Sequence, residues 1–115
     1  MSYLQRSEIA LEQVQFVDPS VFEPLVAETL TKYQAKELGA RGIAVNIVAP
    51  GAIETDFGGG MVRDNEQVNK GIASQTALGR VGVPNDIGGV VAFLCTDEAR
   101  WINAQRIEVS GGQAI

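Results

Sequence analysis

A short apolar run that ends in a proline–glycine turn constrains this chain more than any other feature. Residues 43–48 (IAVNIV) are rich in β-branched side chains, which predicts a strand covered on both faces. Pro50 and Gly51 follow at once, and Thr55 then supplies a hydroxyl. In open α/β sheets, ligands bind just beyond the carboxyl ends of the strands. Because glycine has no side chain and proline fixes the entry angle, this turn suits the close approach of a planar ligand.

The N-terminal third of the chain predicts a strand followed by a helix. Residues 13–17 alternate polar and apolar side chains, as a half-buried strand does. A capping box that begins at Ser20 predicts a helix to about residue 38, with Gly39 or Gly42 as its C-cap. One face of this helix is apolar and carries Phe22, Val26, Leu30 and Tyr33, with Leu38 near its end.

The remaining pattern predicts two shorter helices and a last strand. Residues 49–63 form a glycine-rich loop, and residues 65–75 a short helix. Pro84 opens another helix, since proline is tolerated in the first turn. Its apolar face would use Ile87, Val90, Val91 and Leu94. Residues 106–109 form the final strand, and this order of strands and helices indicates an α/β fold.

Length, charge and cysteine content exclude several classes of protein. A chain of 115 residues, 45% hydrophobic and 20% charged, allows one small globular domain. A net charge of −5 argues against nucleic-acid binding, which needs clustered basic residues. No apolar run is long enough for a membrane span, and no secretory signal is evident. With Cys95 alone and no histidine, we expect no internal disulfide, no metal site and a reducing, cytoplasmic location.

From about residue 30 to its end, the chain closely resembles the C-terminal portion of the short-chain dehydrogenases/reductases. The resemblance rests on an ordered series of short motifs: KEL at 36–38, GIAVN at 42–46, PG at 50–51, GRVG at 79–82, PNDI at 84–87, FLC at 93–95 and IEVSGG at 107–112. The family's fold is a single Rossmann-type domain. Residues 1–115 are therefore expected to form one truncated Rossmann-like domain, a parallel sheet with flanking helices that is completed by oligomerisation.

Residues 1–29 are an N-terminal piece whose assignment stays open. Residues 14–19 followed by 25–28 resemble an earlier strand and helix of the same family, in which the strand ends in an aspartate near the cofactor's adenine. In that case two pieces of the parent fold would be deleted, namely the glycine-rich first turn and the middle with the catalytic residues.

The resemblance implies an NAD or NADP site at the proline–glycine turn. Pro50 and Gly51 would shape it, while the backbone at Ile53 and the hydroxyl of Thr55 would hold the carboxamide of nicotinamide. The alternative is an inherited loop conformation with nothing bound. Asn46 is interpreted as a structural strand residue.

The family's other functional motifs are missing, so we assign no catalytic residue. No glycine-rich phosphate-binding motif follows a first strand. The family's tyrosine precedes its lysine by four residues, whereas Tyr33 precedes Lys36 by three, and Tyr3 has no lysine at that spacing. The serine that would polarise a carbonyl has no counterpart.

Several other residues have a structural interpretation. Glu54 and Asp56 are read as solvated carboxylates rather than an acid/base pair. Gly58 to Gly60 would make a substrate-covering loop flexible. We expect Cys95 to be a packing residue, and Trp101 an anchor in the core or in a subunit interface.

Two functions remain. The first is an NAD(P)-dependent oxidoreductase that passes a hydride between nicotinamide and a small alcohol or carbonyl substrate. The second is a non-catalytic, self-assembling remnant of that family, or a subunit that depends on a partner. Because three strands make a sheet too small to cover its helices, we expect a homodimer or homotetramer.

Overall fold

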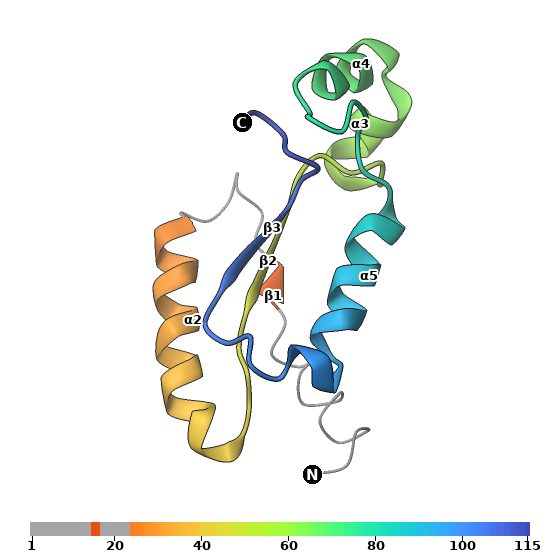
Figure 1. Ribbon diagram of the computed structural model, residues 1–115. Helices are drawn as coiled ribbons and strands as arrows, with labels where there is room; N and C mark the ends of the chain where they lie inside the picture. Colours follow the sequence, from red (N-terminus) through yellow and green to blue (C-terminus); the bar gives the residue numbers. More distant parts are fainter. Residues whose placement is uncertain (1–14, 17–23) are drawn as a thin grey trace. The chain divides into compact units, whose positions relative to one another are not determined.

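The computed structural model describes residues 15–16 and 24–115, and in this part of the chain the strands form one small parallel sheet (Figure 1). The sheet has three strands in the order β1-β2-β3: β1 (Gln15–Phe16), β2 (Ile47–Pro50) and β3 (Arg106–Val109). Strands β1 and β2 are parallel. The Ile47 N–H donates to the Gln105 carbonyl and the Gly51 N–H to the Val109 carbonyl. Because both bonds keep the same sequence offset, β2 and β3 also run parallel.

The helices follow the predicted order. They are α2 (Pro24–Leu38), α3 (Met61–Asp64), α4 (Glu66–Ser74) and α5 (Pro84–Leu94), with short 3₁₀ turns η1 (Gly39–Arg41), η2 (Phe57–Gly60) and η3 (Asp97–Ala99). The predictions of helices ending near residue 38, spanning 65–75 and opening at Pro84 are confirmed, while the capping box at Ser20 lies outside the described residues. The prediction of a glycine-rich loop over 49–63 was wrong in part, because η2 and α3 lie within it.

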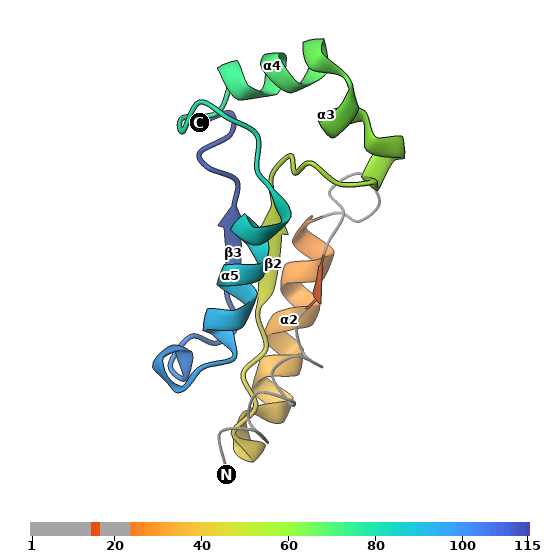
Figure 2. The same cartoon turned by 90° about the vertical axis from the view of Figure 1, so that its right-hand side faces the viewer.

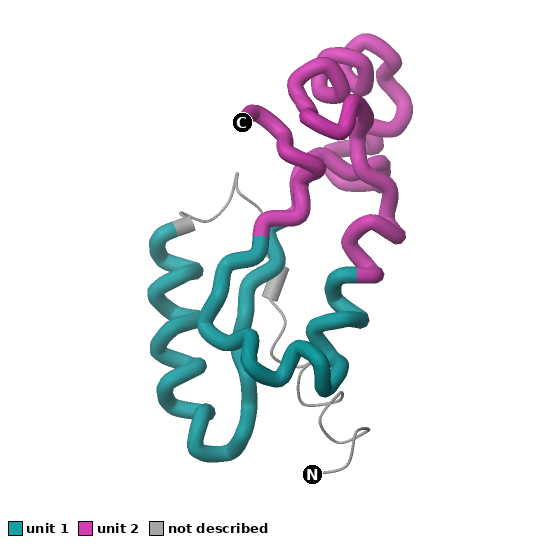
Figure 3. Tube along the Cα trace, in the orientation of Figure 1, with its two compact units in different colours: residues 1–49, 90–107 teal, residues 50–89, 108–115 magenta. Residues whose placement is uncertain are grey.

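The chain divides into two compact units, drawn in different colours in Figure 3. Unit 1 comprises residues 1–49 and 90–107, and unit 2 residues 50–89 and 108–115. Within unit 1, α2 and residues 90–94 of α5 lie on opposite sides of the strands (Figures 1 and 2). Unit 1 is thus a layered α/β arrangement, as the sequence predicted.

The core of unit 1 lies along the predicted central strand. Val45, Ile47 and Val48 are almost completely buried, which confirms cover on both faces. The strand itself begins at Ile47 rather than at residue 43. The reason is that the Val45 N–H donates to the side chain of Asn103 and the Val45 carbonyl accepts from Ala104, so a turn satisfies this backbone in place of a strand.

Asn46 is a structural residue, as predicted. Its side-chain amide donates to the Ile102 carbonyl at 3.1 Å, and its side-chain oxygen accepts from the Gln105 N–H at 3.0 Å. The residue is only 8% exposed. Both hydrogen bonds tie the chain before β2 to the chain before β3, so they help to set the register of the two strands.

Helix α2 packs through small residues and leaves its large apolar side chains outside. Ala27, Thr31 and Ala35 form the buried stripe, at a spacing of one helical turn. Of the predicted apolar side chains, Leu30 is 49% and Tyr33 69% exposed, whereas Leu38 packs against the core. Small side chains allow the helix backbone to approach the sheet closely, which explains why the bulky residues occupy the other face.

Unit 2 begins where β2 ends. Beyond the turn, Ile53 forms a parallel bridge with Gly82, and Thr76 an antiparallel bridge with Gln113. Helix α4 begins after Asn65, whose side chain accepts from the Val68 N–H. The two bridges join the segment after the turn, residues 76–82 and the C-terminal segment, which are distant from one another in sequence.

Other predictions about single residues have mixed outcomes. Cys95 is buried, as a packing residue should be. Trp101 is 95% exposed, so of its two predicted roles the place in the core was wrong, and the place in a subunit interface stays a prediction. None of the helices in the described part of the chain is long and apolar enough to cross a membrane.

Candidate functional site

Gly51 lacks a side chain because the C-terminal segment lies against it. A Cβ at this position would meet both Cα and Cβ of Ser110 at 2.8 Å and the side-chain oxygen of Gln113 at 2.9 Å. That same oxygen accepts from the Ala52 N–H at 2.9 Å. The close approach that the sequence predicted at Gly51 is therefore made by the protein's own C-terminal segment.

The backbone of Ile53 has both of its polar groups turned outward. In the bridge to Gly82, the Gly82 N–H donates to the Ala52 carbonyl and the Glu54 N–H donates to the Gly82 carbonyl. In a parallel pair with this pattern, the N–H and carbonyl of the middle residue point away from the partner. Among the described residues, neither group of Ile53 has a hydrogen-bond partner. One residue thus offers a donor and an acceptor side by side.

Thr55 lies two residues beyond Ile53 and is half-buried. Its side-chain oxygen accepts from the Phe57 N–H at 3.2 Å. Because this bond uses the oxygen as an acceptor, the hydroxyl proton is available as a donor to another group. The four residues that the sequence singled out, Pro50, Gly51, Ile53 and Thr55, are all half-buried and lie on one continuous stretch of unit 2.

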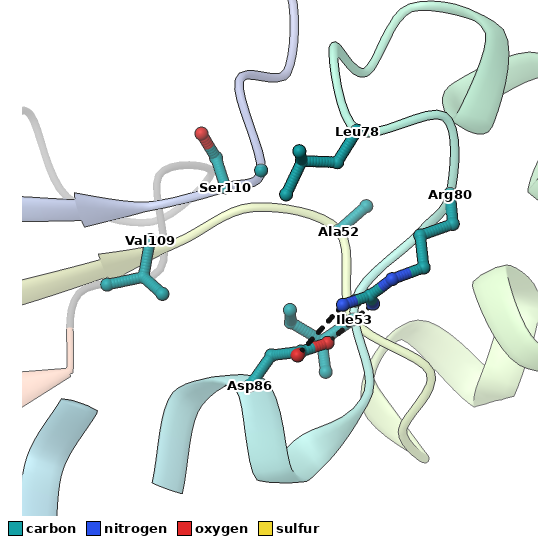
Figure 4. Close-up of a pocket in the computed structure, with 9 residues that line it drawn as sticks. Ala52, Ile53, Leu78, Arg80, Asp86, Val109 and Ser110 are labelled. Atoms are coloured by element: carbon teal, nitrogen blue, oxygen red, sulfur yellow. Dashed lines mark hydrogen bonds and ion pairs between the residues drawn. The ribbon is translucent and has the colours of Figure 1, made fainter. Parts of the chain in front are cut away.

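A cavity of about 180 Å³ lies beside this stretch, within unit 2. Figure 4 shows Ala52, Ile53, Leu78 and Val109 around it, with the guanidinium of Arg80 and the carboxylate of Asp86 meeting next to Ile53. The residues that line the cavity are mainly apolar, so a hydrophobic surface lies beside the turn.

Arg80 and Asp86 form a bidentate ion pair at the edge of this cavity. The two Nη···Oδ distances are 2.6 and 3.0 Å. Asp86 also accepts from the Val83 N–H at 2.8 Å, which caps the start of α5. The bonds from Arg80, and then from Val83, lower the pKa of Asp86 to about 2. The pair therefore holds the chain between residues 80 and 86, including Gly82, in place against Ile53.

The acidic residues near the turn are paired with neighbours in unit 2. Glu54 accepts from the side-chain amide of Asn69 at 2.9 Å. Asp56 pairs with Arg63 at 2.5 Å, although its side chain is 95% exposed. The two carboxylates thus have separate structural partners, and Glu54 is half-buried, so its interpretation as a solvated carboxylate was wrong.

One backbone N–H at the start of α4 and one at the start of α5 is bound by a side chain. Asn65 accepts from the Val68 N–H, and Asp86 accepts from the Val83 N–H. Those two N–H groups are therefore not available to the phosphates of a dinucleotide. Within residues 15–16 and 24–115, no group of three metal-ligating side chains is present.

Sequence reasoning missed four residues that shape this region. Asn69 and Gln113 hold the loop through side-chain amides, and the ion pair of Arg80 with Asp86 holds the segment that faces Ile53. For the ion pair a signal was available, since the motif PND marks a helix start and an acidic residue there attracts a nearby cation. The partners of the two amides lie far away in sequence, so no local pattern indicates them.

Most of this chain is similar in sequence to known oxidoreductases. A family described as enoyl-(acyl carrier protein) reductase matches residues 26–114. An uncharacterized oxidoreductase of Methylorubrum extorquens is 45% identical over 78 residues, which make up 68% of this chain and 32% of that protein. The chain spans only about a third of the length of the curated relatives that it matches.

Two solved structures are each similar to about three quarters of this chain. The promiscuous reductase LugOII, described as catalysing keto-reduction at C1 during lugdunomycin biosynthesis, is 42% identical with a TM-score of 0.68, over 76% of this chain and 34% of its own. A blue fluorescent protein from a metagenomic library, in complex with NADPH, is 34% identical with a TM-score of 0.68, over 78% of this chain and 35% of its own.

Proposed function

Because the chain belongs to the short-chain dehydrogenase/reductase family, we propose that residues 50–55 bind the nicotinamide end of NAD or NADP and so serve an oxidoreductase reaction. Keto-reduction by LugOII and the NADPH bound to the blue fluorescent protein support a carbonyl substrate and this cofactor class. Residues 1–115 would act as one domain, with residues 1–29 as its N-terminal piece.

The backbone of Ile53 carries this proposal. A primary carboxamide has one carbonyl acceptor and one NH₂ donor, and it needs the opposite pair to bind it. Ile53 offers that pair from a single residue whose groups face away from Gly82. The Thr55 hydroxyl, with its oxygen already fixed by Phe57, would add a further donor at the same site.

The chain's residues would orient the nicotinamide ring, and the bound cofactor would supply the hydride. Ile53 would fix the rotation of the carboxamide, and hence which face of the ring meets the substrate. The apolar lining beside the turn would exclude water from one side of the ring. No proton donor is assigned to this chain, which leaves the alternative of a partner-dependent or non-catalytic subunit.

The test separates the two halves of the dinucleotide. Saturation-transfer NMR would measure contact of nicotinamide mononucleotide and of AMP with the protein at millimolar concentration. We expect transfer to the nicotinamide protons and none to the adenine. A Thr55→Val variant should weaken binding about fivefold, since one hydrogen bond contributes about 1 kcal/mol. Thr29→Val is the matched control, because Thr29 is an exposed threonine on α2. Transfer to AMP alone, or to neither nucleotide, would contradict the proposal.

We also propose that the chain self-associates as a homodimer or homotetramer through α2. Leu25, Val26, Leu30 and Tyr33 are all between 49% and 70% exposed on this helix. Such a run of exposed apolar side chains is typical of an interaction surface. Two copies that bury it against each other would form the symmetric contact common among oligomers.

A reducing cytoplasm is the location that we propose for this protein. Cys95 is a buried thiol, and burial raises its pKa. A thiol in this state is unreactive and suited to packing.

A further inference from the structure

The loop that follows the turn returns to it through one side chain, Asn69. The amide nitrogen of Asn69 donates both to the carboxylate of Glu54 and to the Val62 carbonyl, each at 2.9 Å. Asn69 and Glu54 are 15 residues apart in sequence. The bond between them therefore closes residues 54–69 into a ring whose base is next to Thr55.

Inside this ring, η2 and α3 carry only local hydrogen bonds, such as those from the Gly59 and Gly60 N–H groups to the Asp56 carbonyl. Gly58, Gly59 and Gly60 all have positive φ angles, of 63°, 74° and 77°. Because glycine has no side chain, the backbone of these three residues can change its φ and ψ angles more freely than that of other residues. The ion pair of Arg63 with Asp56 spans the ring, but Asp56 is 95% exposed and such pairs contribute little. The half-buried bond at the base is the stronger restraint, because a charged acceptor strengthens it.

We infer that Asn69 is a positioning residue that holds Glu54 and Thr55 in the conformation that binds nicotinamide. This inference rests on the proposed function of residues 50–55. The Glu54 N–H donates to the Gly82 carbonyl, and the Glu54 carboxylate accepts from the side chain of Asn69. Thr55 follows directly, so the position of its hydroxyl depends on both restraints. Without Asn69, binding would have to order this segment, and affinity would fall.

The test uses a pair of isosteric changes. Asn69→Asp places a second carboxylate against Glu54 and the Val62 carbonyl, which converts attraction into repulsion. Adding Glu54→Gln restores a donor, since the new amide can donate to the aspartate. Hydrogen exchange of the amides of residues 55–60 reports the loop, and the Kd for nicotinamide mononucleotide reports the site. Glu54→Gln alone measures the loss of the acceptor's charge, because its neutral amide oxygen can still accept from Asn69.

We expect Asn69→Asp to speed exchange over residues 55–60 and to raise the Kd about tenfold, corresponding to one charge-assisted hydrogen bond. The double variant should recover much of both losses, whereas a merely structural role would change and restore exchange and leave the Kd constant. Unchanged exchange in Asn69→Asp, or no recovery in the double variant, would overturn the inference. Faster exchange and its rescue, without nucleotide binding by any variant, would support the closing bond and overturn the proposed function instead.

Discussion

Substituting Gly51 by alanine tests the packing of the turn against the C-terminal segment. The new Cβ would lie 2.8 Å from both Cα and Cβ of Ser110, closer than such atoms approach in folded proteins. Since one of these atoms is backbone, no rotamer change relieves the contact. Overpacking of this kind costs about 1–3 kcal/mol. We therefore expect the free energy of unfolding to fall by about 2 kcal/mol.

Urea unfolding followed by circular dichroism measures this loss. With a slope of about 1.5 kcal/mol per molar urea, the midpoint should fall by about 1 M. Gly71→Ala is the matched control, because a Cβ there meets nothing within 4 Å and the residue lies inside α4. Alanine in a helix interior is favoured over glycine by about 0.5–1 kcal/mol, so this variant should gain stability.

A second change sharpens the test. Adding Ser110→Gly to Gly51→Ala removes one of the two 2.8 Å contacts with Ser110 and keeps the other. The double variant should therefore recover part of the lost stability. If Gly51→Ala is as stable as the unaltered chain, the C-terminal segment does not pack against the turn and the reasoning is refuted.

Three further predictions follow from single contacts. Thr31→Val should raise the free energy of unfolding by about 1 kcal/mol in urea, because the buried Thr31 hydroxyl has no partner in the described structure; a loss would refute this. The pKa of Asp86 lies at about 2 in the fold against 3.8 for the free group, so its contribution is complete above pH 3.8 and lost as the pH falls toward 2. Thermal unfolding of Asp86→Asn should lack that part of the pH dependence, and an unchanged profile would contradict it. Leu30→Glu should convert the oligomer to monomer in sedimentation, whereas Lys32→Glu, also on α2, should not; equal masses for both would oppose the α2 interface.

The local pattern predicted the elements of this fold well. The short helix at residues 65–75, the helix that opens at Pro84 and the strand before Pro50 were each predicted from neighbouring residues, and each element formed. The start of β2 was wrong by four residues, because Asn103 is distant in sequence and competes for the backbone of Val45. Likewise, the large side chains on α2 predicted its apolar face. The packing shows that the small residues of α2 face the sheet instead.

The candidate site was predictable in part. The proline–glycine turn and Thr55 could be recognised from a short motif. The outward-facing groups of Ile53 depend on the bridge to Gly82, and the restraint on Glu54 depends on Asn69. Both arise from long-range contacts, which periodicity does not encode.

If residues 50–55 hold a nicotinamide carboxamide, the amide resonance of Ile53 must respond to it. Nicotinamide mononucleotide would be titrated into ¹⁵N-labelled protein, with AMP as the control. We expect the Ile53 amide to shift downfield in a saturable way, together with Thr55, and only with the nicotinamide compound. Resonances that stay in place at Ile53 while others move, or that respond equally to AMP, would contradict it.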